Sequence, residues 1–117
     1  MSRIAPALTG GNAVIALASE THPLAAIELA EAIATSDVPG GVVNLLTGQR
    51  AELAPWLAAH MDVNAIDITG ANGLRADLER AAAENVKRIV IADPDAQSLW
   101  EISAFLELKT VWHPIGV

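Results

Sequence analysis

The residue types that carry nucleophilic or metal chemistry are scarce in this chain. It contains no cysteine, so the polypeptide has no thiol nucleophile of its own. Its three histidines, His22, His60 and His113, are far apart and show neither the i,i+4 pairing nor the spacing of a metal site. We interpret His22 as a residue at a helix start, and His60 as one at a helix end, where the helix dipole favours a cation. The predicted site therefore contains no metal and no thiol.

The residues with the clearest binding chemistry follow predicted strands. Glu20 comes shortly after one apolar run and Gly48 after a second, and the turn Thr69-Gly70-Ala71-Asn72-Gly73 follows a third. A glycine turn that opens a helix presents backbone N–H groups that can bind a phosphate. The same residues also serve as ordinary turn glycines, and Glu20 as a helix-start charge. Both interpretations are kept: a ligand site at Glu20, Gly48 and Gly70, or local structure alone.

The elements that must position these residues alternate between strands and helices. Pro23 opens a helix with apolar residues on one side, and Pro39-Gly40-Gly41 ends it. Pro55 should bend the next helix or move its start. The predicted strands span residues 13–17, 42–46, 65–68, 87–92 and 110–115, and the later helices span 51–60, 74–85 and 97–106. This alternation predicts an α/β fold: an open parallel sheet of about four to five strands with helices on both faces.

The last predicted strand differs from the others. Pro114 cannot donate to a ladder, so the strand over residues 110–115, after the C-terminal helix, should lie at an edge or meet another chain. Trp100, Phe105 and Trp112 gather in the same region of a chain with few aromatic residues. Large aromatics here either cover the end of the core or anchor an interface with another chain.

Length and charge narrow the class of protein. At 117 residues the chain is long enough for one domain with its own core. Its net charge of −7 disfavours nucleic acid as a partner. No apolar run reaches the about 18–20 residues that span a bilayer, so no membrane partner is expected. The first residues do not form a signal peptide, and the absence of cysteine fits a cytoplasmic location.

Three sequence strings together resemble the aldehyde dehydrogenase superfamily. RIAPALTGGNAVIALASE (3–20) and VPGGVVNLLTG (38–48) are similar to the family's cofactor-binding half, and FLELKTVWHPIG (105–116) is similar to its C-terminal helix and oligomerisation strand. The resemblance implies a single domain over residues 1–117. Residues 1–92 would form a Rossmann-like part, and residues 97–117 a helix and an oligomerisation-type strand.

The resemblance also implies which site residues remain. In the family the first string carries a lysine and a glutamate that bind the adenosine ribose, and these positions hold Leu17 and Glu20 here. The serine of the family's glycine turn corresponds to Ala71, and the general-base glutamate to Ala92. The segment with the nucleophilic cysteine is missing between Asp93 and the C-terminal helix, and the oxyanion asparagine would precede residue 1. The expectation is a chain that is not an enzyme on its own.

These observations lead to one hypothesis and two alternatives. The hypothesis is a non-catalytic domain, an accessory or C-terminal part of a larger or split dehydrogenase, that assembles with a second copy or with a catalytic aldehyde dehydrogenase subunit. It binds no cofactor, and its interface residues are Trp100, Phe105, Leu108, Val111, Trp112, His113 and Ile115. The alternatives are a weak adenine-nucleotide module that binds NAD or NADP through Glu20, Gly48 and Gly70, and a fragment of an active oxidoreductase.

Overall fold

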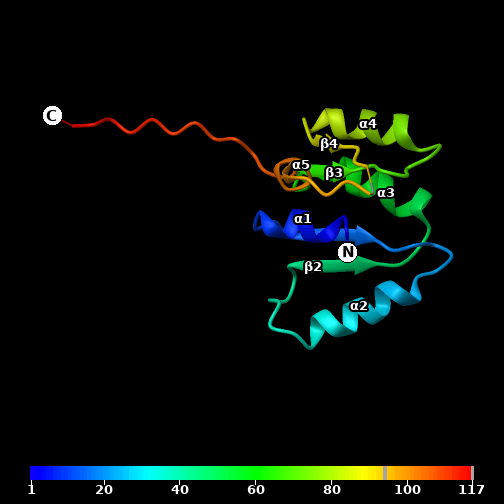
Figure 1. The fold of residues 1–117 in the computed structure, drawn as a ribbon. Helices are drawn as coiled ribbons and strands as arrows, with labels where there is room; N and C mark the ends of the chain where they lie inside the picture. The colour runs from blue at the N-terminus through cyan, green and yellow to red at the C-terminus, as the bar shows by residue number, and fades with distance from the viewer. Residues whose placement is uncertain (94, 117) are drawn as a thin grey trace.

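The computed structural model describes residues 1–93 and 95–116, in which four short strands alternate with helices (Figure 1). This confirms the predicted α/β class. The strands are β1 (Val14–Leu17), β2 (Val43–Leu46), β3 (Ala65–Asp67) and β4 (Arg88–Val90). The helices are α1 (Ile4–Thr9), α2 (Leu24–Ala34), α3 (Arg50–Ala59), α4 (Arg75–Glu84) and α5 (Leu99–Ser103).

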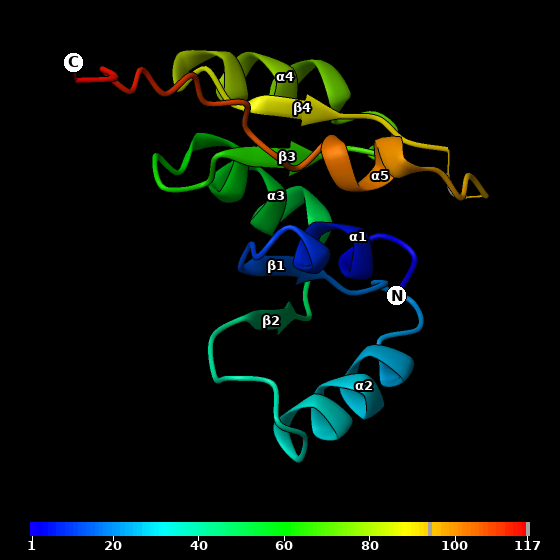
Figure 2. The same ribbon diagram turned by 60° about the vertical axis from the view of Figure 1, so that its left-hand side comes forward.

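The strands are parallel, but they form two sheets of two strands. β1 pairs with β2 in the register Val14↔Val43, and β3 pairs with β4 in the register Ala65↔Arg88. In Figure 2 the strands follow the order β2-β1-β3-β4 with their arrows in one direction. The prediction of one sheet of four to five strands is corrected in this respect, because no ladder joins β1 to β3 among the described residues.

The core lies where α3 and α4 pack against the sheet of β3 and β4. Small side chains on both helices let them approach closely, and Ala58 and Ala82 are completely buried. The core cluster consists of Ala54, Ala58, Ile68, Ala71 and Leu78. α3 runs through Pro55 without a later start, and Pro55 is exposed on its surface. The predicted shift of the start of this helix is therefore wrong.

The C-terminal segment contradicts the predicted edge strand. α5 is shorter than the predicted helix 97–106, and residues 106–116 form neither helix nor strand. This segment, which we call the tail, runs away from the rest of the chain (Figure 1). The radius of gyration of 16.1 Å accordingly exceeds the about 13 Å typical of a compact domain of similar length. A strand forms only where a neighbouring edge pairs with it, and among the described residues no strand pairs with the tail.

Arg3 is one of the residues whose side chains connect the first part of the chain to β3 and α5. Arg3, at the start of α1, donates from Nε to Asp67 Oδ2 at 2.7 Å and from Nη1 to Glu101 Oε2 at 2.6 Å. It thereby ties α1 to the end of β3 and to α5. Burial works against the charge of the guanidinium, but the hydrogen bonds to Asp67 and Glu101 outweigh it and raise the pKa of Arg3 above its ordinary value.

Replacing this arginine should destabilise the fold. Arg3→Met leaves two carboxylates without their cation, and the side chain of Glu101 is only 7% exposed. We expect the free energy of unfolding in urea to fall by roughly 2–4 kcal/mol. The control is Arg75→Met, which removes an exposed ion pair with Glu79 and should change stability by less than about 0.5 kcal/mol. Equal effects of the two variants would contradict the role given to Arg3.

Candidate functional site

The predicted binding residues gather around the first turn of α3. Glu20 follows β1, Gly48 follows β2 and Gly70 follows β3, so all three lie where the parallel strands end. A carboxylate oxygen of Glu20 accepts a hydrogen bond from the backbone N–H of Arg50, the first residue of α3. Nη1 of Arg50 donates to the carbonyl oxygen of Gly70 at 3.1 Å. Arg50 therefore links two of the three predicted residues.

The glycines hold backbone conformations that other residues rarely adopt. Gly70 has φ +75° and Gly48 has φ +151°. A Cβ atom added at Gly48 would lie 2.9 Å from Cδ1 of Leu53, which is too close without a shift of that side chain. Glycine at position 48 thus allows the end of β2 to lie close to α3, and glycine at position 70 allows the turn after β3.

This arrangement fits an adenine nucleotide only in part. The helix N-terminus, which can bind an anion, already has the Glu20 carboxylate as its partner. Leu17 offers no donor for a ribose hydroxyl, and Ala71 offers only a methyl group. The groups that remain for binding a ligand are the half-buried side chain of Arg50 and the two turns at Gly48 and Gly70, where φ is positive.

The position that the resemblance assigns to a general base has a structural role. Ala92 is buried, and its backbone N–H donates to Oγ1 of Thr69 at 2.9 Å. Its methyl side chain can neither accept nor release a proton. Within residues 1–93 and 95–116 no three His, Asp or Glu side chains group as metal ligands. His60 ends α3, as predicted, and its Nδ1 accepts the backbone N–H of Asp62 at 3.2 Å.

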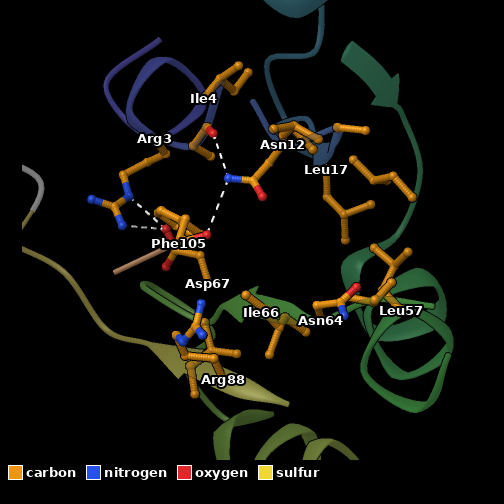
Figure 3. Close-up of a pocket in the computed structure, with 18 of the residues that line it drawn as sticks. Arg3, Ile4, Asn12, Leu17, Leu57, Asn64, Ile66, Asp67, Arg88 and Phe105 are labelled. Atoms are coloured by element: carbon orange, nitrogen blue, oxygen red, sulfur yellow. Dashed lines mark hydrogen bonds and ion pairs between the residues drawn. The ribbon is translucent and has the colours of Figure 1, made fainter. Parts of the chain in front are cut away.

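One cleft of the structure was not predicted from the sequence. It is a cleft of about 1330 Å³ between β1 and β3, lined by the consecutive residues 12–17 on one wall and 64–71 on the other. Figure 3 shows Arg3, Asp67 and Phe105 at one part of it, with Leu17 and Ile66 facing the interior. Asn12 Nδ2 bonds to the carbonyl oxygens of Ala7, at 2.9 Å, and Phe105, at 3.3 Å.

Several contributing residues escaped sequence interpretation. Arg3, Arg50 and Glu101 gave no local signal, whereas Asp67 was noticeable as a carboxylate in an apolar strand. Asp67 caps the turn after β3, because its Oδ1 accepts the backbone N–H of Thr69 at 2.8 Å. Lys87 is buried, and its Nζ donates to the carbonyl oxygen of His60.

The predicted interface residues divide into two groups. Phe105 is partly buried beside the cleft, so one aromatic does cover the core. The others are exposed, most strongly Leu108 (100%), Ile115 (93%) and Trp112 (89%), followed by Val111, Trp100 and the polar His113. Exposure of this many apolar side chains on one short segment is unusual for an isolated soluble chain.

Parallel strands joined by helices, with loops gathered at the strand ends around a helix N-terminus, define a Rossmann-like domain. The family model described as "Aldehyde dehydrogenase family" matches residues 1–93. The chain therefore belongs to the aldehyde dehydrogenase family, whose members are oxidoreductases that use NAD or NADP.

Individual relatives agree with this assignment. The chain is 38% identical to a betaine aldehyde dehydrogenase of Bacillus subtilis over 76% of its own length and 18% of that protein. It is 30% identical to a putative aldehyde dehydrogenase-like protein of Schizosaccharomyces pombe over 98% of its own length and 23% of that protein. The crystal structure of an aldehyde dehydrogenase from Bartonella henselae matches 77% of this chain and 19% of its own, with a TM-score of 0.68 and 30% identity.

The chain thus spans about a fifth of the length of these relatives. In the part of the chain that the structure describes, no helix is both long and apolar enough to cross a bilayer.

Proposed function

We propose that this chain is a non-catalytic aldehyde dehydrogenase domain that acts by assembly, as an accessory or C-terminal part of a larger or split dehydrogenase. The proposal that the chain is non-catalytic rests on one observation: it contains no cysteine, although the family's reaction depends on a thiol. The position of the general base is Ala92, which is buried and bonded through its backbone. A thioester reaction needs a thiolate, a base and an oxyanion site together.

The proposal that the chain acts by assembly rests on the tail. Leu108, Val111, Trp112 and Ile115 are exposed on a segment without regular structure. Apolar burial and strand pairing are the interactions by which such a segment binds a second chain. The partner is a second copy or a catalytic aldehyde dehydrogenase subunit, in a cytoplasmic setting. We propose no membrane partner, and no nucleic-acid partner either, because the net charge of −7 repels a phosphate backbone.

The proposal that the chain is non-catalytic is tested by an activity assay. The purified chain, incubated with an aldehyde and NAD or NADP, should produce no reduced nicotinamide, because no side chain can form the thiohemiacetal. The measurement is nicotinamide absorbance, with a complete aldehyde dehydrogenase as the positive control. Steady reduction by the purified chain alone would overturn this half of the proposal.

The proposal that the chain assembles through its tail is tested by its molecular mass in solution. Deleting residues 110–117 should lower the oligomer mass measured by light scattering, because the deletion removes most of the exposed apolar side chains of the tail. Trp112→Ser should act in the same direction. Trp56→Ser, at an exposed tryptophan on α3, is the matched control and should leave the mass unchanged. A mass that the deletion does not alter would reject assembly through the tail.

One observation favours a second function, weak binding of an adenine nucleotide. Glu20, Gly48 and Gly70 meet at the carboxyl ends of three strands, and Arg50 adds a positive charge beside them. This is the edge of a parallel α/β sheet where nucleotides bind in other proteins. The nucleotide would be NAD or NADP, held by its adenosine half.

Calorimetry with NAD, NADP, ATP and coenzyme A separates the two functions. Binding at micromolar concentration that is lost in Glu20→Ala would support the nucleotide module. Because Glu20 also caps α3, Glu20→Gln is the control: its amide oxygen still accepts the Arg50 N–H while the charge is gone. The assembly proposal expects no measurable heat from any of the four compounds.

A further inference from the structure

The turn after β3 is joined to α5 by consecutive polar contacts. Asp67 lies at their centre: its Oδ1 accepts the backbone N–H of Thr69 at 2.8 Å, and its Oδ2 accepts Nε of Arg3 at 2.7 Å. From the same guanidinium, Nη1 donates to Oε2 of Glu101, in the first turn of α5, at 2.6 Å. Figure 3 shows Arg3 and Asp67 pointing toward one another. The side chain of Arg3 therefore contacts both the carboxylate that caps the turn and the carboxylate that anchors α5.

The conformation of this turn bears on the candidate nucleotide site. Oγ1 of Thr69 accepts the backbone N–H of Ala92 at 2.9 Å, so the turn is also joined to the chain that leaves β4. The carbonyl oxygen of the next residue, Gly70, accepts Nη1 of Arg50 at 3.1 Å. A change in the cap at Thr69 would therefore displace the Gly70 carbonyl from Arg50.

α5 depends on its contacts with α1 for its helical structure. It has only five residues, whereas an isolated helix shorter than about 12–15 residues is marginal in water. Besides the ion pair of Glu101, the carbonyl oxygen of Phe105 accepts Nδ2 of Asn12 at 3.3 Å. Leu106 packs so closely on Gly10 that a Cβ atom there would collide with it. We therefore expect two states of α5, one docked on α1 and one released without helical structure.

The hold on Asp67 differs between these two states. With α5 docked, Glu101 is buried, and the side chains of Arg3 and Asp67 are only 26% and 20% exposed. Release of α5 would uncover the pair of Arg3 and Asp67, and an exposed ion pair contributes little to stability. Asp67 would then be held less firmly in the orientation that caps Thr69. Conversely, loss of the Asp67 charge would leave Arg3 less firmly placed for Glu101, because coupling between two sites is reciprocal.

We propose that Arg3 couples the docking of α5 to the conformation of the turn Thr69–Gly73. The docked helix orders the turn through Arg3 and Asp67, and the ordered turn favours the docked helix. Arg3 and Glu101 are thus positioning residues for a turn that Glu101 does not touch. The inference goes beyond the proposed function, since it requires neither a partner chain nor a nucleotide. Because the tail continues directly from α5, a change at the start of the tail would reach the glycine turn by these contacts.

Amide hydrogen exchange, followed by NMR on the full chain, tests the coupling from α5 to the turn. Glu101→Gln removes the charge that faces Arg3 and should speed exchange of the Thr69 and Ala92 amides severalfold. The amide of Leu78, in the core of α4, should exchange as before. The matched control is Glu79→Gln, which removes an exposed ion pair with Arg75 and should leave the Thr69 and Ala92 amides unchanged.

Asp67→Asn tests the coupling in the opposite direction. The asparagine Oδ1 can still accept the Thr69 N–H, so the cap is kept while the charge facing Arg3 is lost. The amides at the end of α5, of Ala104 and Phe105, should then exchange severalfold faster. The matched control is Asp77→Asn, at an exposed ion pair with Arg80, which should not affect them.

Two results would overturn the inference. In one, Glu101→Gln speeds exchange only within α5 and Asp67→Asn only in the turn, which would make the two contacts independent of each other. In the other, the Leu78 amide is accelerated as much as the rest, which would mean a general loss of stability. If either variant fails to fold, Arg3→Lys decides. It keeps the positive charge but lacks the planar fork that reaches both carboxylates, so it should speed exchange in the turn and at the end of α5 together.

Discussion

The structure depends on the ion pairs of Arg3. In the part of the chain that the structure describes, no backbone ladder joins the sheet of β1 and β2 to the sheet of β3 and β4, so side chains must connect them. Arg3 does so with one guanidinium that reaches Asp67 and Glu101, which are 64 and 98 residues away in the sequence. Glu101 is buried, and a buried carboxylate is stable only beside its cation. The position of α1 and α5 against β3 follows from this requirement.

The same division explains why the interior is built from small residues. The buried apolar residues are mainly alanines, and no large side chain of residues 1–93 and 95–116 is completely buried. Leu17 and Ile66, one from each sheet, pack against the core cluster but remain partly accessible beside the cleft.

Patterns within single segments of the sequence predicted the features that depend on neighbouring residues, above all the positions of the strands. The four strands follow apolar runs, since strands of a parallel sheet are covered on both faces, and each lies within two residues of its predicted bounds. Glu20 and Gly70 were expected near each other because parallel strands end at one edge. Three features could not be predicted in this way: the division into two sheets, the partners of Glu101 and the missing edge strand. Each depends on contacts between residues far apart in the sequence, and the pattern of one segment contains no information about such contacts. Arg50 was missed because a helix-start arginine has no distinctive spacing.

The apolar residues at the family's polar positions belong to the packing of this chain. Ala71 is part of the core cluster, Ala92 is buried beside β4, and Leu17 packs against the same cluster. A lysine, serine or glutamate at these places would need a hydrogen-bond partner, and a buried carboxylate at position 92 would be costly without one. Thr69 already uses its hydroxyl on the backbone N–H of Ala92. The side chains at these three positions therefore stabilise the fold of this chain.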